Sequence, residues 1–373
     1  MKVTKPMTAA KRMSVTTGKI IASVLLLMFL AVLLLGCAAP IDVENNITFT
    51  DSSGRMVKLP EEITRIAPSG AVATMILATI APEYLVCISS TPSSAQIPYL
   101  SSDLLMLPTT GQFYGTRSTM NLESLLDADP QVIIDLGDTK DGIASDMNLI
   151  QKQTGIPTIF IEADLNSIAD AYHTLGQLLY GKSERGDTLS AFIADTLEMA
   201  RNNTAKLKTE DIISVMYTSG TSGLGTHPQG SLQAQVLELV GVKNAIVTEN
   251  ISNSGSGNPI SMEQLYIFEP EVILFSQDSI YSTVGTAATW MELSAIDNNR
   301  YFEVPMLPYN WLGNPPSVNM TIGVWWLGNL IYPELYDYDM IEKAQEIYKL
   351  FWNYDLSDDE AQQMLQNSTL KNR

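Results

Sequence analysis

A segment of sixteen residues occurs twice in this chain, 140 positions apart. Residues 121–136 are NLESLLDADPQVIIDL, and residues 261–276 are SMEQLYIFEPEVILFS. The identical pairs are Glu123 and Glu263, Leu125 and Leu265, Pro130 and Pro270, Val132 and Val272, and Ile133 and Ile273. A repeat within one chain predicts that one structural unit is built twice.

Both copies predict the same local structure. Asn121 and Ser261 are polar residues of the type that caps a helix N-terminus, and about two helical turns follow each of them. An acidic residue and a proline then end each helix. The apolar runs that come next, residues 132–136 and 272–275, are typical of strands covered on both faces.

Flanking segments extend each copy into a larger α/β unit. We expect helices near residues 142–154 and 286–296, and strands at residues 158–161 and 301–304. Upstream strands at residues 65–67 and 212–217 each lead through a Ser/Gly loop into a helix. The predicted fold is therefore α/β, with two pseudo-symmetric Rossmann-like lobes and a ligand cleft between them.

The segment between the two copies predicts a helical strut. Residues 165–207 contain no proline and carry apolar residues at helical spacing, although Gly181 and Gly186 interrupt the pattern. A helix of about 20 residues spans roughly 30 Å, enough to bridge two lobes. We thus predict an N-terminal lobe at 47–164, a bridging helix at 165–207, a C-terminal lobe at 208–318 and C-terminal helices at 319–373.

The N-terminus has the pattern of a targeting segment. Five basic residues precede or begin an apolar run at residues 20–35, which ends at Leu-Leu-Gly-Cys. This sequence resembles a bacterial lipobox and predicts a signal peptide at 1–36, lipidation of Cys37 and a tether at 37–46. The alternative is an uncleaved membrane anchor. In both cases the protein is extracytoplasmic and attached to the membrane.

Composition excludes several functions. A formal net charge of −19 repels nucleic acid. Two cysteines and two histidines cannot build a Cys/His zinc cluster, and we expect no disulfide, metal site or cofactor. Neither G-x-S-x-G nor H-E-x-x-H is present, so we expect no enzyme. A glycan-acting or ligand-sensing surface lipoprotein remains a remote alternative.

Together these features resemble the Fe/B12-type periplasmic-binding family, whose members are helix-hinged binding proteins for siderophores, haem and cobalamin. The resemblance covers about residues 47–350, and the segment ITFTDSSGRMVKLPEEITRIAPS looks like the family's N-terminal hairpin and first strand. It implies a monomer that delivers an iron chelate to an ABC permease dimer with its ATPase. It also implies that Glu123 and Glu263 dock on permease arginines. First-turn helix stabilisation is the simpler alternative for both glutamates.

Four residues in the loops that follow the predicted strands are candidates for ligand binding: Tyr114, Arg117, His227 and Trp311. Arg117 can pair with an anion or form a local salt bridge, and His227 can bind a metal or an anion or be incidental. Tyr114 and Trp311 can stack on a flat ligand or simply pack. The glycine-rich loop 220–231 lacks the lysine of a P-loop, so it is not a nucleotide site. Its backbone N–H groups can still bind an anion, and an oxyanion such as molybdate or tungstate is therefore an alternative ligand.

Overall fold

The computed structural model describes residues 46–114 and 118–370. The predicted signal peptide, Cys37 and nearly all of the tether lie outside the described residues, as does Arg117. None of the described helices combines the length and the apolar character needed to cross a membrane.

The first lobe is built on a parallel three-stranded sheet in the order β3-β4-β5. Its strands are β3 (Ile66–Pro68), β4 (Val132–Gly137) and β5 (Thr158–Glu162). Alternate residues of β4 reach different cores, with Ile133 packing on the α5 side and Ile134 on the α2 side. Because helices cover both faces, the strand is buried along nearly its whole length.

Four helices belong to this lobe: α2 (Ala71–Ile80), α3 (Ser102–Leu105), α4 (Leu122–Asp127) and α5 (Ile143–Thr154). A hairpin of β1 (Asn46–Thr50) and β2 (Met56–Pro60) precedes the sheet. Arg55 pairs with Asp51 at 2.9 Å and also donates to the Thr158 carbonyl, which ties the hairpin to β5. The hairpin that the family resemblance implied is thus present.

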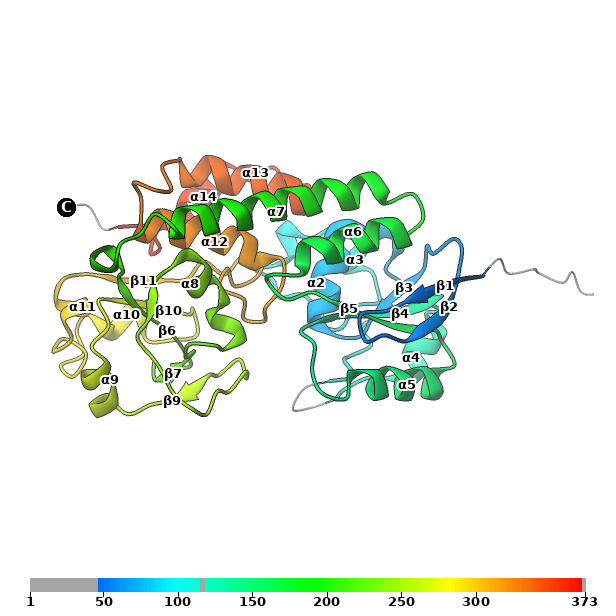
Figure 1. Cartoon of the computed structure of the whole chain (residues 1–373), viewed down its shortest axis with the longest axis horizontal. Helices are drawn as coiled ribbons and strands as arrows, with labels where there is room; N and C mark the ends of the chain where they lie inside the picture. Colours follow the sequence, from blue (N-terminus) through cyan, green and yellow to red (C-terminus); the bar gives the residue numbers. More distant parts are fainter. Residues whose placement is uncertain (1–45, 115–117, 371–373) are drawn as a thin grey trace, which may run out of the picture. The chain divides into compact units, whose positions relative to one another are not determined.

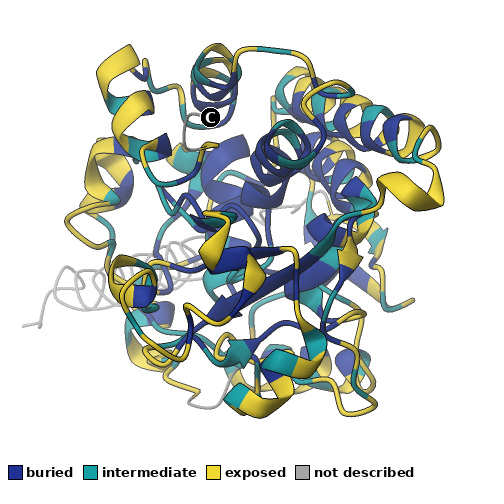
Figure 2. Ribbon diagram, turned by 90° about the vertical axis from the view of Figure 1, so that its left-hand side faces the viewer, coloured by how far each residue is buried: buried dark blue, intermediate teal, exposed yellow. Residues whose placement is uncertain are grey.

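The second lobe is built on a separate six-stranded sheet, ordered β11-β10-β6-β7-β9 with β8 beside β6. Its strands are β6 (Ser214–Ser219), β7 (Gly225–Thr226), β8 (Lys243–Asn244), β9 (Asn258–Pro259), β10 (Val272–Phe275) and β11 (Tyr301–Glu303). Strands β6, β10 and β11 are mutually parallel. The separate three-stranded and six-stranded sheets confirm the predicted two-lobed α/β fold. In Figure 2 strands at the centre are coloured as buried, whereas exposed residues gather on outer turns and loops.

The two copies of the repeat form equivalent elements. The Asn121 side chain accepts a hydrogen bond from the Ser124 amide at the start of α4, and Ser261 accepts one from Gln264 at the start of α9 (Met262–Phe268). Each helix is followed by a central strand of its sheet, β4 or β10. The capping and the strands expected from the repeat are therefore confirmed.

One predicted helix is wrong. Residues 286–296 form no continuous helix. The single turn α10 (Tyr281–Val284) ends before this segment, and the single turn α11 (Ser294–Asp297) begins only near its end. The chain turns between them so that Trp290 is buried against Phe275, with ring centroids 5.5 Å apart. Packing of this aromatic pair under β10 overrides the local helical pattern.

The strut consists of two helices, α6 (Ile168–Leu178) and α7 (Ser183–Thr204), rather than one. The chain turns back at Gly181, whose φ of +65° suits glycine. Helix α7 packs on α6 within the strut and also contacts α2 of the first lobe and α8 (Gln235–Val240) of the second. Figure 1 shows α7 extending past both sheets.

Three helices close the described chain: α12 (Asn319–Ile331), α13 (Met340–Trp352) and α14 (Asp358–Leu365). Helix α12 packs on α7, α8 and α13, and Trp326 is almost completely buried. These helices extend the core of the second lobe towards α7, and they lie where C-terminal helices are predicted at 319–373.

Candidate functional site

Loops at the carboxyl ends of the parallel strands of both sheets come together between the lobes. The Gln96 side chain donates to the Pro308 carbonyl at 3.0 Å, and the Ser317 hydroxyl lies 3.2 Å from the Met75 sulfur. A cavity of about 80 Å³ lies beside these contacts, with Tyr309 contributed by the second lobe. Because ligands of open α/β folds bind beyond the carboxyl ends of strands, this region is the candidate ligand site.

Hydroxyl groups lie beside apolar side chains such as Met75 and Ile88 in the lining of this cavity. The first lobe contributes Thr74, Ser89 and Ser90, and the second lobe contributes Tyr309. The Thr74 hydroxyl donates to Ser89 at 3.0 Å, which orients both groups. Burial raises the pKa of Tyr309 to about 12, so its hydroxyl stays protonated at neutral pH. The cavity therefore offers neutral donors and acceptors.

On the first-lobe side, Asp135 is a buried acid within β4. Its side chain is 7% exposed and accepts a hydrogen bond from the Ser69 hydroxyl. Burial raises the pKa of Asp135 to about 6, although Ser69 and Lys140 partly oppose the increase. An acid in an otherwise apolar strand was the sequence signal for this group, and our strand prediction did not single it out.

This pKa predicts an unusual pH dependence of stability. Between the ordinary aspartate pKa near 4 and the folded value near 6, the folded protein binds more protons than the unfolded chain, so stability should fall as pH rises. The full effect is about 3 kcal/mol, since one pKa unit is worth about 1.4 kcal/mol. Urea unfolding of Asp135→Asn at pH 4 to 7 should show this fall reduced. An unchanged fall would contradict the assignment, and Asp141→Asn, an exposed acid, serves as the control.

Tyr114 lies next to this acid. Its hydroxyl is buried without a hydrogen-bond partner among the described residues, and Lys140 Nζ lies 3.7 Å from the ring centroid. Burial and the nearby Asp135 raise the pKa of the Tyr114 phenol. Tyr114 therefore lies near the carboxyl end of β4, where we expect a residue that binds the ligand in the cleft. Lys140 covers one face of its ring.

On the second-lobe side, His227 is fully buried. Its ring stacks on Tyr217 at 4.6 Å, and Nε2 lies 3.1 Å from the Ser219 hydroxyl at the end of β6. Burial lowers the pKa of His227 to about 4, so the imidazole is neutral at pH 7. Nδ1 has no partner among the described residues. The residue can orient Ser219, while direct contact with a ligand would require movement of the chain around it.

Trp311 also points into the protein. Its side chain is 0% exposed, donates from Nε1 to the Leu307 carbonyl at 3.0 Å and meets Trp326 edge-on. No hydrogen bond or ring contact joins Tyr114, His227 and Trp311 within the described chain. Their roles in binding stay predictions, as does that of Arg117. The cavity residue Tyr309 was not singled out by sequence, since nothing local distinguishes it from other loop tyrosines.

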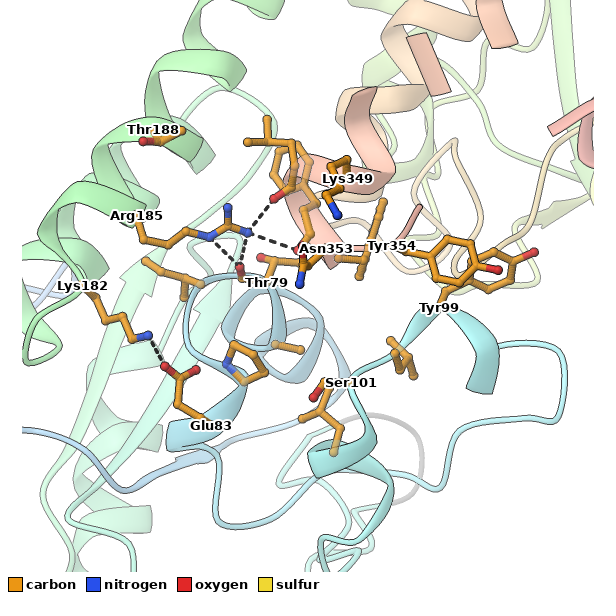
Figure 3. A pocket seen from close by; sticks show the side chains of 18 of the residues that line it. Thr79, Glu83, Tyr99, Ser101, Lys182, Arg185, Thr188, Lys349, Asn353 and Tyr354 are labelled. Carbon is orange, nitrogen blue, oxygen red and sulfur yellow. Dashed lines mark hydrogen bonds and ion pairs between the residues drawn. The ribbon is translucent and has the colours of Figure 1, made fainter. Parts of the chain in front are cut away.

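A larger groove of about 810 Å³ lies elsewhere, between the C-terminal ends of α2 and α13 and the start of α7. Figure 3 shows Arg185 reaching across it, where the guanidinium donates to the carbonyls of Thr79, Leu350 and Phe351. Lys182 pairs with Glu83. Arg185 thus satisfies carbonyls at two helix ends and joins α2, α7 and α13.

Comparison with known proteins supports the two-lobed assignment. The chain matches the family described as periplasmic binding protein over residues 86–306. It belongs to that family. No curated protein matches the chain. Among solved structures, it is similar to an ABC transporter solute binding protein from Sulfurospirillum deleyianum, with 28% identity and a TM-score of 0.78 over 86% of this chain and 99% of that one.

More distant structures share the fold of this periplasmic binding protein. A periplasmic solute binding protein from Veillonella parvula is 24% identical, with a TM-score of 0.70 over 87% of this chain and 98% of that one. The molybdate-bound protein MolA from Haemophilus influenzae is 17% identical, with a TM-score of 0.67 over 83% of this chain and 99% of that one.

These likenesses set the broad function. The family and its structural neighbours are solute-binding proteins of ABC transporters and not enzymes, and periplasmic binding proteins act outside the cytoplasm. For a periplasmic binding protein, the cleft between the lobes rather than the α2/α7/α13 groove is the expected solute site.

The two predicted docking glutamates lie on the surface. Glu123 is exposed in the first turn of α4, and Glu263 is exposed in the first turn of α9. A hydrogen bond from Ser261 lowers the pKa of Glu263. Neither carboxylate forms an ion pair with another described residue. Both charges are therefore available to a partner, and docking stays a prediction.

Proposed function

We propose that this protein is the lipid-anchored substrate-binding subunit of an ABC importer and that its ligand is a metal chelate with a neutral or positive overall charge. The observation that carries the ligand class is the charge of the cleft loops. The described parts of the loops that follow the parallel strands carry Asp138, Asp141 and Asp278 and one lysine, Lys140. Arg117 adds one further cation, so the acids exceed the bases by one. A strongly anionic siderophore complex would meet net repulsion there.

The lipid anchor rests on the sequence around Cys37. A basic segment, an apolar run and a Leu-Leu-Gly-Cys ending together favour cleavage and lipidation over an uncleaved span. Anchoring keeps the binding protein near the permease at the membrane surface. In this proposal Tyr114, Arg117, His227 and Trp311 contribute to the ligand site, with Ser219 and Tyr309 as additional polar groups.

An oxyanion is the second candidate ligand, and the size and chemistry of the inter-lobe cavity favour it. A volume of about 80 Å³ suits a small tetrahedral anion better than a haem or cobalamin, unless the lobes separate. Hydroxyls from Ser89, Ser90 and Tyr309 can donate hydrogen bonds to oxyanion oxygens without charge. A molybdate-bound neighbour shares the fold, which makes such a ligand compatible with this architecture.

Thermal unfolding of the purified full-length protein distinguishes these ligands. We expect a cationic or neutral ferric chelate, haem or cobalamin to raise the unfolding temperature, because a ligand at a hundredfold excess over Kd stabilises the folded state by about 2.7 kcal/mol. Molybdate and tungstate test the second candidate, and trianionic ferric chelates serve as the charge control. Stabilisation by the trianionic complexes alone would contradict the charge argument. Native mass spectrometry would show whether a ligand copurifies.

A further inference from the structure

The buried acid Asp135 lies on the face of β4 that packs on α5. Alternate residues of a strand point to the same side, so Asp135 shares this side with Ile133. Its neighbour across the sheet, Phe160 of β5, belongs to the same core. Phe113 and Tyr114, from the loop before α4, also pack on this core. The acid and the segment Phe113–Tyr114 therefore meet on one side of the sheet.

Two hydrogen bonds connect Asp135 to this segment through Ser69. The Ser69 hydroxyl donates to the Asp135 carboxylate, and the Ser69 carbonyl accepts from the Phe113 amide at 3.0 Å. Ser69 directly follows β3 and is buried. The hydroxyl of Tyr114, the next residue, has no hydrogen-bond partner in the described chain. The contact with Ser69 thus holds the backbone next to a tyrosine that we expect at the ligand site.

Several charged and titratable groups surround Asp135 and Tyr114. They are Lys140 after β4, Asp146 on α5, Cys87 in the shared core, and the Asp51–Arg55 pair beside β5. Lys140 favours the ionised form of Asp135, but its Nζ lies 3.1 Å from the Asp146 carboxylate, which disfavours that form. Burial outweighs these effects and raises the pKa of Asp135 to about 6. At pH 7 the buried carboxylate is thus mostly ionised, and it forms no ion pair with another described residue.

We propose that Asp135 is a positioning residue for the ligand site, and that its ionisation releases the segment Phe113–Tyr114 so that water reaches the carboxylate. Burial of an unpaired charge is unfavourable, whereas a neutral acid is tolerated and can still bond to Ser69. Phe113 and Tyr114 belong to a loop, while the other neighbours belong to the sheet or to α5, so this segment moves at the lowest cost. The consequence for ligand binding rests on the proposed function, in which Tyr114 contributes to the site.

Proton linkage gives the direction and size of the effect. The covered acid has a raised pKa, so the covered state binds more protons than the open state, and a rise in pH favours opening. With a pKa of about 6 when covered and about 4 when hydrated, opening should become about tenfold more frequent between pH 5 and pH 7.

Hydrogen exchange of the Phe113 amide in the ligand-free full-length protein tests this proposal. This amide exchanges when its hydrogen bond to Ser69 opens, and its rate, corrected for intrinsic exchange, should rise about tenfold from pH 5 to pH 7. Asp135→Asn keeps the shape of the side chain but cannot ionise, so its corrected rate should not change with pH. Dilute urea should leave the rate nearly constant, because a local opening exposes little surface.

Two further variants make the test specific. Asp138→Asn is the matched control, because burial also raises the pKa of Asp138 to about 6, while its acidic neighbours are Asp164 and Glu162. This variant should keep the tenfold change. Ser69→Ala removes a hydrogen bond that lowers the pKa of Asp135, so the change should persist and move to higher pH.

The outcomes separate this inference from the proposed function. Equal corrected rates at pH 5 and pH 7 in the unaltered protein, a steep dependence on dilute urea, or a tenfold change that survives in Asp135→Asn would each overturn it. Loss of the change in Asp138→Asn alone would assign the effect to that acid instead. If Asp135→Asn does not fold, an unshifted pH dependence in Ser69→Ala contradicts the proposal. Since no ligand is present, a failure of every ligand to stabilise the protein would overturn the proposed function and leave this result standing.

Discussion

Reversing both surface glutamates, Glu123→Arg and Glu263→Arg, should reduce ligand uptake at least a hundredfold while ligand affinity stays within about twofold of the unaltered value. Each substitution replaces an exposed carboxylate with a cation, which the predicted docking places against a permease arginine. Truncating one partner of a desolvated interfacial charge pair costs about 2 to 5 kcal/mol, and a factor of ten in binding corresponds to about 1.4 kcal/mol. Two reversals should therefore abolish productive docking.

A matched pair of helix glutamates serves as the control. Glu184 and Glu342 are exposed first-turn residues of α7 and α13 and have no ion pair with a described residue. Glu184→Arg with Glu342→Arg perturbs two helix N-termini to the same extent as the docking variant does. If both double variants transport equally well, Glu123 and Glu263 serve only their own helices. Normal uptake by Glu123→Arg with Glu263→Arg would contradict docking. Uptake is measured with radiolabelled ligand, and ligand affinity is measured by calorimetry.

Gly186→Ala should destabilise the protein by about 3 kcal/mol or more. A Cβ atom at Gly186 would lie 2.5 Å from the Gly176 Cα and 2.7 Å from the Tyr172 carbonyl oxygen, so α6 and α7 would have to separate. Overpacking typically costs 1 to 3 kcal/mol, and here the obstacle is backbone that cannot rotate away. The sign is diagnostic, because alanine in an unobstructed helix is about 0.5 to 1 kcal/mol better than glycine.

Urea unfolding at neutral pH measures this effect, since the midpoint falls in proportion to lost stability. Thr188→Ala, an exposed change on the same helix, should alter stability by less than about 1 kcal/mol. Equal or greater stability of Gly186→Ala would show that α6 and α7 do not approach so closely. A normal Thr188→Ala together with a strongly destabilised Gly186→Ala would confirm the close contact between the two helices of the strut.

The glycines of the strut illustrate what local patterns miss. Gly181 and Gly186 both interrupt the helical periodicity, yet Gly181 ends a turn between helices and Gly186 lies inside α7. Only the approach of α6, ten residues earlier in sequence at Gly176, explains why position 186 must lack a side chain. The periodicity of a sequence indicates which residues share one face of a helix. It contains no information on the distance between that helix and a neighbouring helix.

The amino-acid sequence by itself determined the repeated unit, its capped helices, its central strands and the two-lobed class, because caps, proline stops and apolar periodicity act within a few residues. Only the tertiary structure decided that Trp311 and His227 point into the protein and that Tyr309 lines the inter-lobe cavity. Burial depends on segments far apart in sequence that pack together. The same long-range packing gives Asp135 its raised pKa.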